Sequence, residues 1–159
     1  MREITHPLLH LNFNQHNQAY VIEASAGTGK TWTIERLFIK ALLERSDLNL
    51  NNILVVTFTN AATSELKDRV LLQIKTTLDC LLKIKAGTNL HEMDEDIFTQ
   101  SFLLPRIHKL DNDINILLQS AQNFDYAPIY TIHGFCNHIL KNYPVECNIN
   151  PEFGLVTEH

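Results

Sequence analysis

The stretch ASAGTGKT, which runs from Ala24 to Thr31, decides the fold of this chain. It meets the phosphate-loop pattern G-x-x-x-x-G-K-[ST], except that Ala24 replaces the first glycine. Gly27 and Gly29 allow the backbone to curl so that successive N–H groups face phosphate oxygens, and a following helix adds its positive N-terminal end. We expect Lys30 to reach the β- and γ-phosphates and the Thr31 hydroxyl to be a Mg²⁺ ligand. Both are therefore candidate catalytic residues.

The residues on either side support this interpretation. Residues 20–23 (YVIE) are a short β-prone run, and apolar positions at helical spacing follow the glycines at Trp32, Leu37, Phe38, Ala41 and Leu42. A glycine-containing turn before a helix is the alternative. The order of strand, loop and helix favours the phosphate loop.

The rest of the chain predicts further strands and helices. Residues 53–58 (ILVVTF) are apolar without alternation, which is typical of a strand covered on both faces in a parallel sheet. A long amphipathic helix is predicted next, with Gly87 placed for a left-handed C-terminal cap, from the apolar positions Leu66, Val70, Ile74, Leu78 and Leu81.

The second half of the chain is less regular. Residues 88–127 predict one or two further helices interrupted at Pro105, and residues 129–131 a brief strand. A last helix from about Ile132 should stop before Pro144. Alternating strands and helices predict an α/β fold with a mostly parallel sheet.

Composition sets limits on the class of protein. With 159 residues, 45% hydrophobic and 19% charged, the chain can bury one ordinary core. A net charge of -5 argues against holding nucleic acid by bulk electrostatics, so any DNA contact should be local. Three cysteines without a CxxC pair fit a reducing compartment, and no apolar run approaches the roughly 20 residues of a membrane span. We expect a soluble, cytoplasmic protein without a membrane partner.

Two further blocks indicate a family. Residues 57–69 read TFTNAATSELKDR, and residues 130–136 read YTIHGFC. Together with IEASAGTGKT they resemble motifs I, Ia and Ib of the UvrD-like superfamily 1 helicases, in that order. The amino-acid sequences of the three blocks are most similar to the RecB family of helicase–nuclease subunits and somewhat less similar to the AddA family. The resemblance runs from about Asn12 to about Cys136 and is tight only within the three blocks.

The resemblance implies a set of site residues. Motif Ia residues approach single-stranded DNA, and motif Ib residues contact its backbone. Phe58 alone could equally be a core residue at a strand end, and His133 could be structural. A metal site at His133, Cys136 and His138 is disfavoured because they lack the spacing of known zinc sites. The implied DNA-binding residues are Thr57, Phe58, Thr59, Asn60, Thr131 and His133.

The nucleotide site follows from the same resemblance. The family has a glutamine upstream of the phosphate loop that reads adenine, and the pattern LNFNQ favours Gln15 over Gln18, although either could be a surface amide. Lys67 and Arg69 are interpreted as solvated helix charges, with a phosphate contact as the alternative. The implied ATP-binding residues are Gln15, Ala24, Ser25, Ala26, Gly27, Thr28, Gly29, Lys30 and Thr31.

The resemblance also implies the domain and its partners. The fold would be part of a P-loop NTPase (RecA-like) domain, with residues 1–159 forming the N-terminal part of a first motor domain and a helical insertion over about 71–127. The parent would be an ATP-dependent DNA helicase and exonuclease of double-strand break repair and recombination. RecC and RecD would be its companions.

The 159 residues lack other parts of such a motor. We find no apolar strand ending in paired acids and no later helicase motif, so we expect a piece of a longer protein that binds ATP·Mg²⁺ weakly without efficient hydrolysis. Three alternatives stay open: an AddA- or UvrD-type helicase fragment, a complete small P-loop enzyme such as a kinase, and a non-enzymatic ATP-responsive DNA-binding module.

Overall fold

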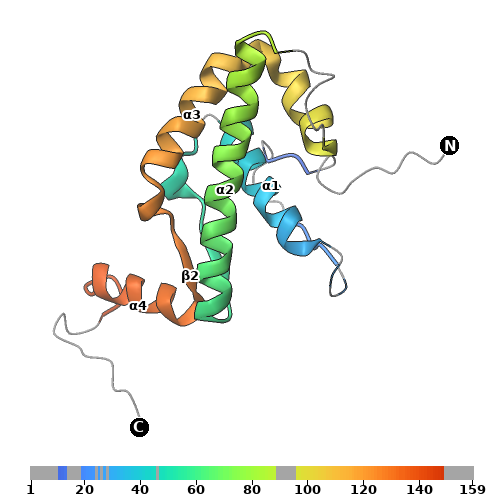
Figure 1. The fold of residues 1–159 in the computed structure, drawn as a ribbon. Coiled ribbons are helices and arrows are strands. Elements are labelled where there is room, and N and C mark those ends of the chain that lie inside the picture. The colour runs from blue at the N-terminus through green and yellow to red at the C-terminus, as the bar shows by residue number, and fades with distance from the viewer. Residues whose placement is uncertain are drawn as a thin grey trace.

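The computed structural model describes residues 11–13, 19–23, 25, 27, 29–45, 47–88 and 96–148. Over these residues the long helix α2 runs through the middle of the molecule, with α1 on one side and α3 on the other (Figure 1). The helices and strands are α1 (Lys30–Glu44), β1 (Val55–Thr57), α2 (Asn60–Lys85), α3 (Leu110–Gln122), β2 (Ile129–Thr131) and α4 (Ile132–Asn142). Shorter helical turns are η2 (Leu50–Asn52), η4 (Thr99–Leu103), η5 (Leu104–Lys109) and η6 (Phe124–Tyr126).

The predicted long helix is confirmed as α2. Its N-cap is Thr59, whose side chain accepts a hydrogen bond from the backbone N–H of Ala62. Gly87, with φ of +79°, follows the last turn in the left-handed conformation that glycine adopts without strain. One stripe of α2 is buried, through Leu66, Val70, Ile74, Thr77 and Leu81.

The core lies where α1, α2, α3 and β2 meet. Fully buried aliphatic side chains come from all four elements, which makes this one continuous core. The largest of them are Ile39, Leu42, Ile74, Leu117, Ile129 and Val70.

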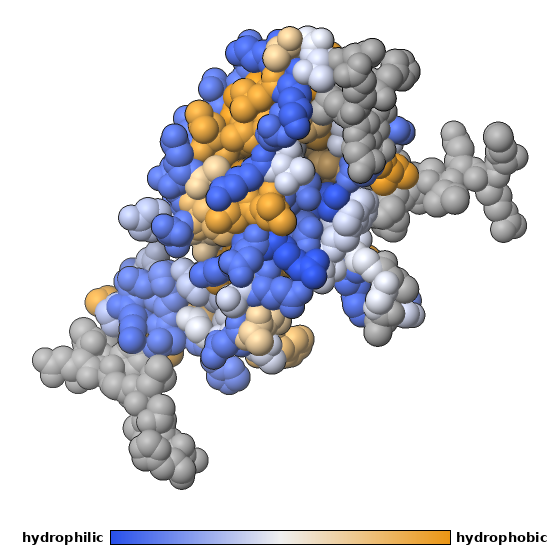
Figure 2. Space-filling view, viewed as in Figure 1, coloured by the Kyte–Doolittle hydropathy of each residue, from blue (hydrophilic) through white to orange (hydrophobic). Residues whose placement is uncertain are grey.

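The outer face of the helices is mixed in character. Leu72, Leu82 and Leu118 are exposed apolar residues of α2 and α3. Figure 2 shows hydrophobic patches over these helices separated by hydrophilic residues. Within the described part of the chain, none of the helices combines the length and apolar character that a membrane crossing requires.

The sheet of the described residues consists of β1 and β2 in parallel. Val55 pairs with Ile129, Val56 with Tyr130 and Thr57 with Thr131. The predicted strand at residues 129–131 and the helix that ends before Pro144 are confirmed. The predicted strand at residues 53–58 is confirmed in a shorter form as β1.

Two predictions about the sheet are wrong. Residues 20–23 are not a strand; the Val21 side chain is 87% exposed, and β1 and β2 pair with each other rather than with this segment. A short apolar run becomes a strand only where a neighbouring strand accepts its hydrogen bonds. β1 is not covered on both faces either, because Val56 is 47% exposed and the described helices cover only its other side.

The segment before α3 is helical, but Pro105 does not interrupt it. The chain passes from π-helical geometry in η4 to 3₁₀ geometry in η5 and then into α3. Pro105 lies in the first turn of η5, where a missing N–H leaves no hydrogen bond unmade. The predicted break is therefore a change in helical pitch.

Arg106 holds this segment against the core. Its Nη2 and Nε lie 2.9 and 3.0 Å from the two carboxylate oxygens of Asp113, and Nη2 also donates to the carbonyl of Leu43. The Asp113 side chain is only 2% exposed. The pair thus connects η5, α3 and the end of α1.

We predict that Arg106→Leu lowers the free energy of unfolding by about 3–5 kcal/mol, because it leaves a buried carboxylate without its cation. Urea denaturation measures this. The control is Lys85→Ala, which removes the exposed ion pair with Asp111 and should cost less than about 1 kcal/mol. Equal losses in the two variants would contradict the assignment.

Candidate functional site

The described glycines of the phosphate loop have the predicted backbone. Gly27 has φ of +78° and Gly29 has φ of +85°, both in the left-handed region. A Cβ at Gly27 would meet nothing within 4 Å, so backbone conformation rather than crowding requires glycine there. Ser25 is exposed. Gln15, Gln18, Ala24, Ala26 and Thr28 lie outside the described residues.

Helix α1 begins directly after these glycines. Gly29 is its N-cap, and the first backbone hydrogen bond runs 2.9 Å from the Thr33 N–H to the Gly29 carbonyl. Lys30 is exposed and Thr31 half-buried in the first turn, where backbone N–H groups point along the axis out of the helix. A curled glycine backbone that leads into the N-terminus of a 15-residue helix suits a polyphosphate. The described residues therefore fit a polyphosphate with a divalent cation.

The second group of predicted residues follows β1. The Thr57 hydroxyl lies 2.6 Å from the hydroxyl of Thr63 and donates to the carbonyl of Thr59 at 3.1 Å. Phe58 is 88% exposed and therefore lies outside the core of the described residues, and Asn60 is exposed in the first turn of α2. The contact of Thr63 with Thr57 is not predicted from the sequence.

The third group follows β2. Thr131 is the N-cap of α4, and its hydroxyl accepts a hydrogen bond from the Gly134 N–H at 3.0 Å. His133 is exposed in the first turn of α4. One turn further on, the ring of His138 stacks on Tyr130 with centroids 5.2 Å apart, so His138 has a packing role.

The register of the sheet brings the second and third groups together. Thr57 and Thr131 are paired at the ends of two parallel strands, and both strands lead into helices within three residues. The N-termini of α2 and α4 therefore open at the same edge of the sheet. We call Thr57, Phe58, Thr59, Asn60, Thr131 and His133 the strand-end edge. Its helix termini carry positive partial charge, although the whole chain is acidic.

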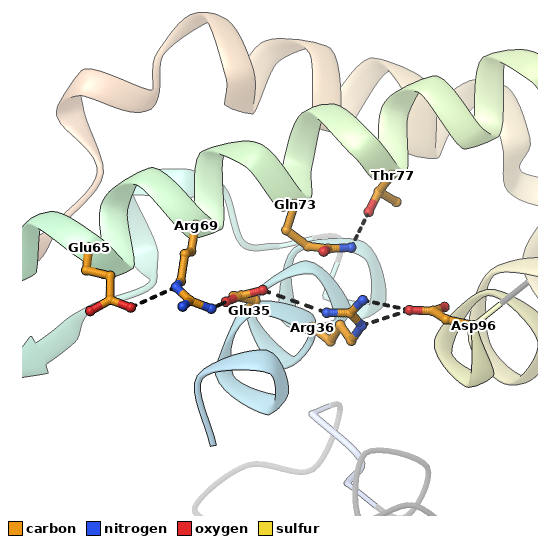
Figure 3. Close-up of polar contacts among 7 residues, drawn as sticks. All are labelled: Glu35, Arg36, Glu65, Arg69, Gln73, Thr77 and Asp96. Carbon is orange, nitrogen blue, oxygen red and sulfur yellow. Dashed lines mark hydrogen bonds and ion pairs between the residues drawn. The ribbon is translucent and has the colours of Figure 1, made fainter. Parts of the chain in front are cut away.

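Arg69, predicted to be a solvated helix charge, is about half exposed, and it also forms two ion pairs that the sequence did not predict. Its guanidinium lies 3.5 Å from the Glu35 carboxylate on α1 and 2.9 Å from Glu65 on α2 (Figure 3). The side chain is 49% exposed, and Glu35 is buried. Arg69 therefore joins α2 to the helix that follows the phosphate loop.

The chain is similar to helicase proteins over most of its length. Residues 10–159 match the family model of the UvrD/REP helicase N-terminal domain. The RecBCD enzyme subunit RecB of Haemophilus influenzae is 35% identical over 153 residues, which is 89% of this chain and 12% of that protein. The protein of the same name from Buchnera aphidicola subsp. Schizaphis graminum is 44% identical over 131 residues, covering 77% of this chain and 10% of the relative.

The relatives are much longer than the chain. The RecB subunit of Escherichia coli K12 is 36% identical over 135 residues, which is 76% of this chain and 10% of that protein. The chain thus spans about a tenth of the length of these curated relatives. The family match favours a helicase over the small-kinase alternative.

We predict that Thr59→Ala lowers the free energy of unfolding by about 1 kcal/mol through loss of the α2 cap, whereas Thr59→Ser keeps most of it. Thermal and urea denaturation of both variants measure the difference. An equal loss in Thr59→Ser would show that the hydroxyl does not cap the helix. Because of this structural role, Thr59 is unsuitable for testing ligand binding.

Proposed function

Since the chain belongs to the UvrD/REP helicase family, we propose that it forms the N-terminal part of the first RecA-like motor domain of a RecB-type, ATP-dependent DNA helicase and exonuclease. In that role it acts in double-strand break repair and recombination, with RecC- and RecD-type subunits as partners. A helical insertion covers about residues 71–127 and includes the second half of α2, η4, η5 and α3. One observation carries the proposal, namely the pairing of Thr57 with Thr131 at one edge of the sheet.

The nucleotide part of the proposal assigns ATP to the start of α1. The positive φ angles of Gly27 and Gly29 support a phosphate cradle, in which the ammonium group of Lys30 neutralises negative charge on the phosphates. Mg²⁺, when bound, neutralises charge on the phosphates, and Thr31 is the described side chain suited to hold it. Gln15 is proposed to read adenine, and Ser25 and the remaining loop residues to line the phosphates.

The DNA part assigns one nucleic-acid strand to the strand-end edge. Exposure of 88% at Phe58 leaves its ring face accessible for stacking on a base, an interaction that tolerates any sequence. The N-termini of α2 and α4 offer backbone N–H groups and partial positive charge to phosphates. Such local contacts suit a chain with a net charge of -5.

Hydrolysis requires groups that we do not find in the 159 residues. No described strand ends in paired carboxylates that could hold the metal and orient the attacking water, since β1 ends at Thr57 and β2 at Thr131. We therefore propose that this chain binds ATP·Mg²⁺ without efficient turnover. Hydrolysis by the purified chain at about one per second, within the range of phosphoryl-transfer enzymes, would contradict this.

We predict that Lys30→Ala weakens ATP·Mg²⁺ binding about 10- to 150-fold, because a hydrogen bond to a charged group contributes roughly 1.5–3 kcal/mol. Isothermal titration calorimetry measures the affinity, and circular dichroism checks that the fold is kept. Lys75→Ala removes the same charge from an exposed position on α2 and should bind ATP normally. Unchanged affinity in Lys30→Ala would show that the phosphate loop is misassigned.

We predict that Phe58→Ala lowers the affinity for a labelled single-stranded oligonucleotide about 5- to 150-fold, from a stacking contribution of roughly 1–3 kcal/mol. Fluorescence anisotropy measures binding. The matched control is Tyr126→Ala, because Tyr126 is 76% exposed but precedes β2 instead of following it. A loss in Tyr126→Ala as large as that in Phe58→Ala would remove the strand-end edge from consideration.

A further inference from the structure

A row of alternating charges connects α2, α1 and the segment before η4 (Figure 3). Glu65 and Arg69 come from α2, Glu35 and Arg36 from α1, and Asp96 from the segment that precedes η4. Each side chain contacts the next one of opposite charge, so that acidic and basic residues alternate along the row. In order, the five residues are Glu65, Arg69, Glu35, Arg36 and Asp96. None of the three segments adjoins another in sequence, so the row is a tertiary contact.

The two ends of this row are tight, and its centre is loose. At one end Arg69 Nε lies 2.9 Å from Glu65, and at the other Arg36 Nη2 and Nε lie 2.7 and 3.0 Å from Asp96. Glu35, in the middle, lies 3.5 Å from Arg69 and 3.7 Å from Arg36. Its carboxylate thus has two cationic partners at similar distances, and its hydrogen bond from Arg69 is a long one.

Burial makes the central contact sensitive to position. The Glu35 side chain is 9% exposed, and a buried carboxylate depends on its cations far more than a surface one does. A shift of a few tenths of an ångström toward either guanidinium would bring the nitrogen–oxygen distance into the range of a strong hydrogen bond. The length of this contact therefore depends on how α1 lies against α2.

Arg36 is the more buried of the two partners, with a side chain 11% exposed against 49% for Arg69. Its guanidinium lies 3.9 Å from the centre of the Trp32 ring and is bound by Asp96. Burial alone would raise the pKa of Asp96, but the Thr99 N–H and the Arg36 guanidinium outweigh it and hold the pKa below its ordinary value. Asp96 thus remains charged at neutral pH, and the Glu35–Arg69 contact is the adjustable one.

The two residues of this contact lie on the helices that carry the two proposed ligand sites. Glu35 is one turn beyond Thr31 on α1, so both lie on the same face of the helix. Arg69 is ten residues beyond the N-cap Thr59 on α2, which is roughly 15 Å along the axis. The contact between Glu35 and Arg69 therefore connects α1 to the helix whose N-terminus belongs to the strand-end edge.

We propose that Glu35 and Arg69 are positioning residues that couple nucleotide binding to single-stranded DNA binding; the proposal rests on the function proposed above. Binding of the nucleotide phosphates shifts the first turn of α1 and thereby changes the distance from Glu35 to Arg69. The altered contact shifts α2, whose N-terminus belongs to the strand-end edge. Coupling of this kind is reciprocal, so DNA changes the nucleotide affinity by the same factor.

The test measures single-stranded oligonucleotide affinity of the full chain with and without saturating ATP·Mg²⁺. In the wild-type chain we expect nucleotide to change the dissociation constant about fivefold or more, a typical coupling. In Glu35→Gln and in Arg69→Gln we expect the factor to fall below about twofold, while each ligand alone binds within about twofold of wild type. The double variant should lose no more coupling than either single variant, because one contact is involved.

Matched controls separate coupling from loss of charge or fold. Asp79→Asn and Lys83→Gln break an exposed ion pair on the same helix and should keep the wild-type factor. Arg69→Lys keeps the positive charge and should retain part of the coupling factor. A merely structural role would lower both single-ligand affinities and the unfolding temperature together, and that result would overturn the proposal.

The outcomes also distinguish this proposal from the function on which it rests. If the wild-type chain binds both ligands but neither affects the other, or if Glu35→Gln keeps the full factor, only the coupling is wrong. If the wild-type chain binds neither ligand, the proposed function fails and the coupling fails with it.

Discussion

The parallel pairing of β1 with β2 is the constraint on which the rest of the described structure depends. It places Thr57 beside Thr131, although the two residues are 74 positions apart in the sequence. Both strands are short, and both lead at once into helices that are capped by threonine hydroxyls. If the pairing slipped by one residue, the side chains of one strand would change faces and the core contact of Ile129 would be lost.

Helix α2 extends that constraint across the molecule. Its 26 residues span roughly 39 Å, from the strand-end edge to the helical segment that includes η4, η5 and α3. Its buried stripe packs against α1 and α3, which holds the start of α1 in place relative to the strand ends. A long, rigid helix with charged contacts to its neighbours is suited to passing small movements between two sites.

Local chemistry could be predicted from the sequence. Glycine at positions 27 and 29 requires no partner to adopt positive φ, and the spacing of Leu66, Val70 and Ile74 is a property of one helix. Properties that depend on distant residues were not predictable in this way. The prediction of a strand at residues 20–23 was wrong because strand pairing depends on a neighbouring strand. The contact of Arg69 with Glu35 joins two helices through residues that are 34 positions apart.

The exposure of site residues was also settled only by the fold. Phe58 could be read as a core or a surface residue, since both environments accept an aromatic ring after a strand, and its 88% exposure separates the two. Pro105 was read as a break because proline disrupts the interior of a helix, whereas its actual position is a first turn. In both cases the residue type allowed two structural environments, and only the fold shows which of them the residue occupies.

Hydrogen exchange of the full chain with a single-stranded oligonucleotide tests the central claim most directly. The account predicts that backbone amides near the starts of both α2 and α4, at residues 59–62 and 131–134, become protected together when the oligonucleotide binds. Those near Tyr126, at the other end of β2, should be unchanged. Protection of only one helix start, or protection near Tyr126 instead, would contradict a single DNA-facing edge built by the pairing of Thr57 with Thr131.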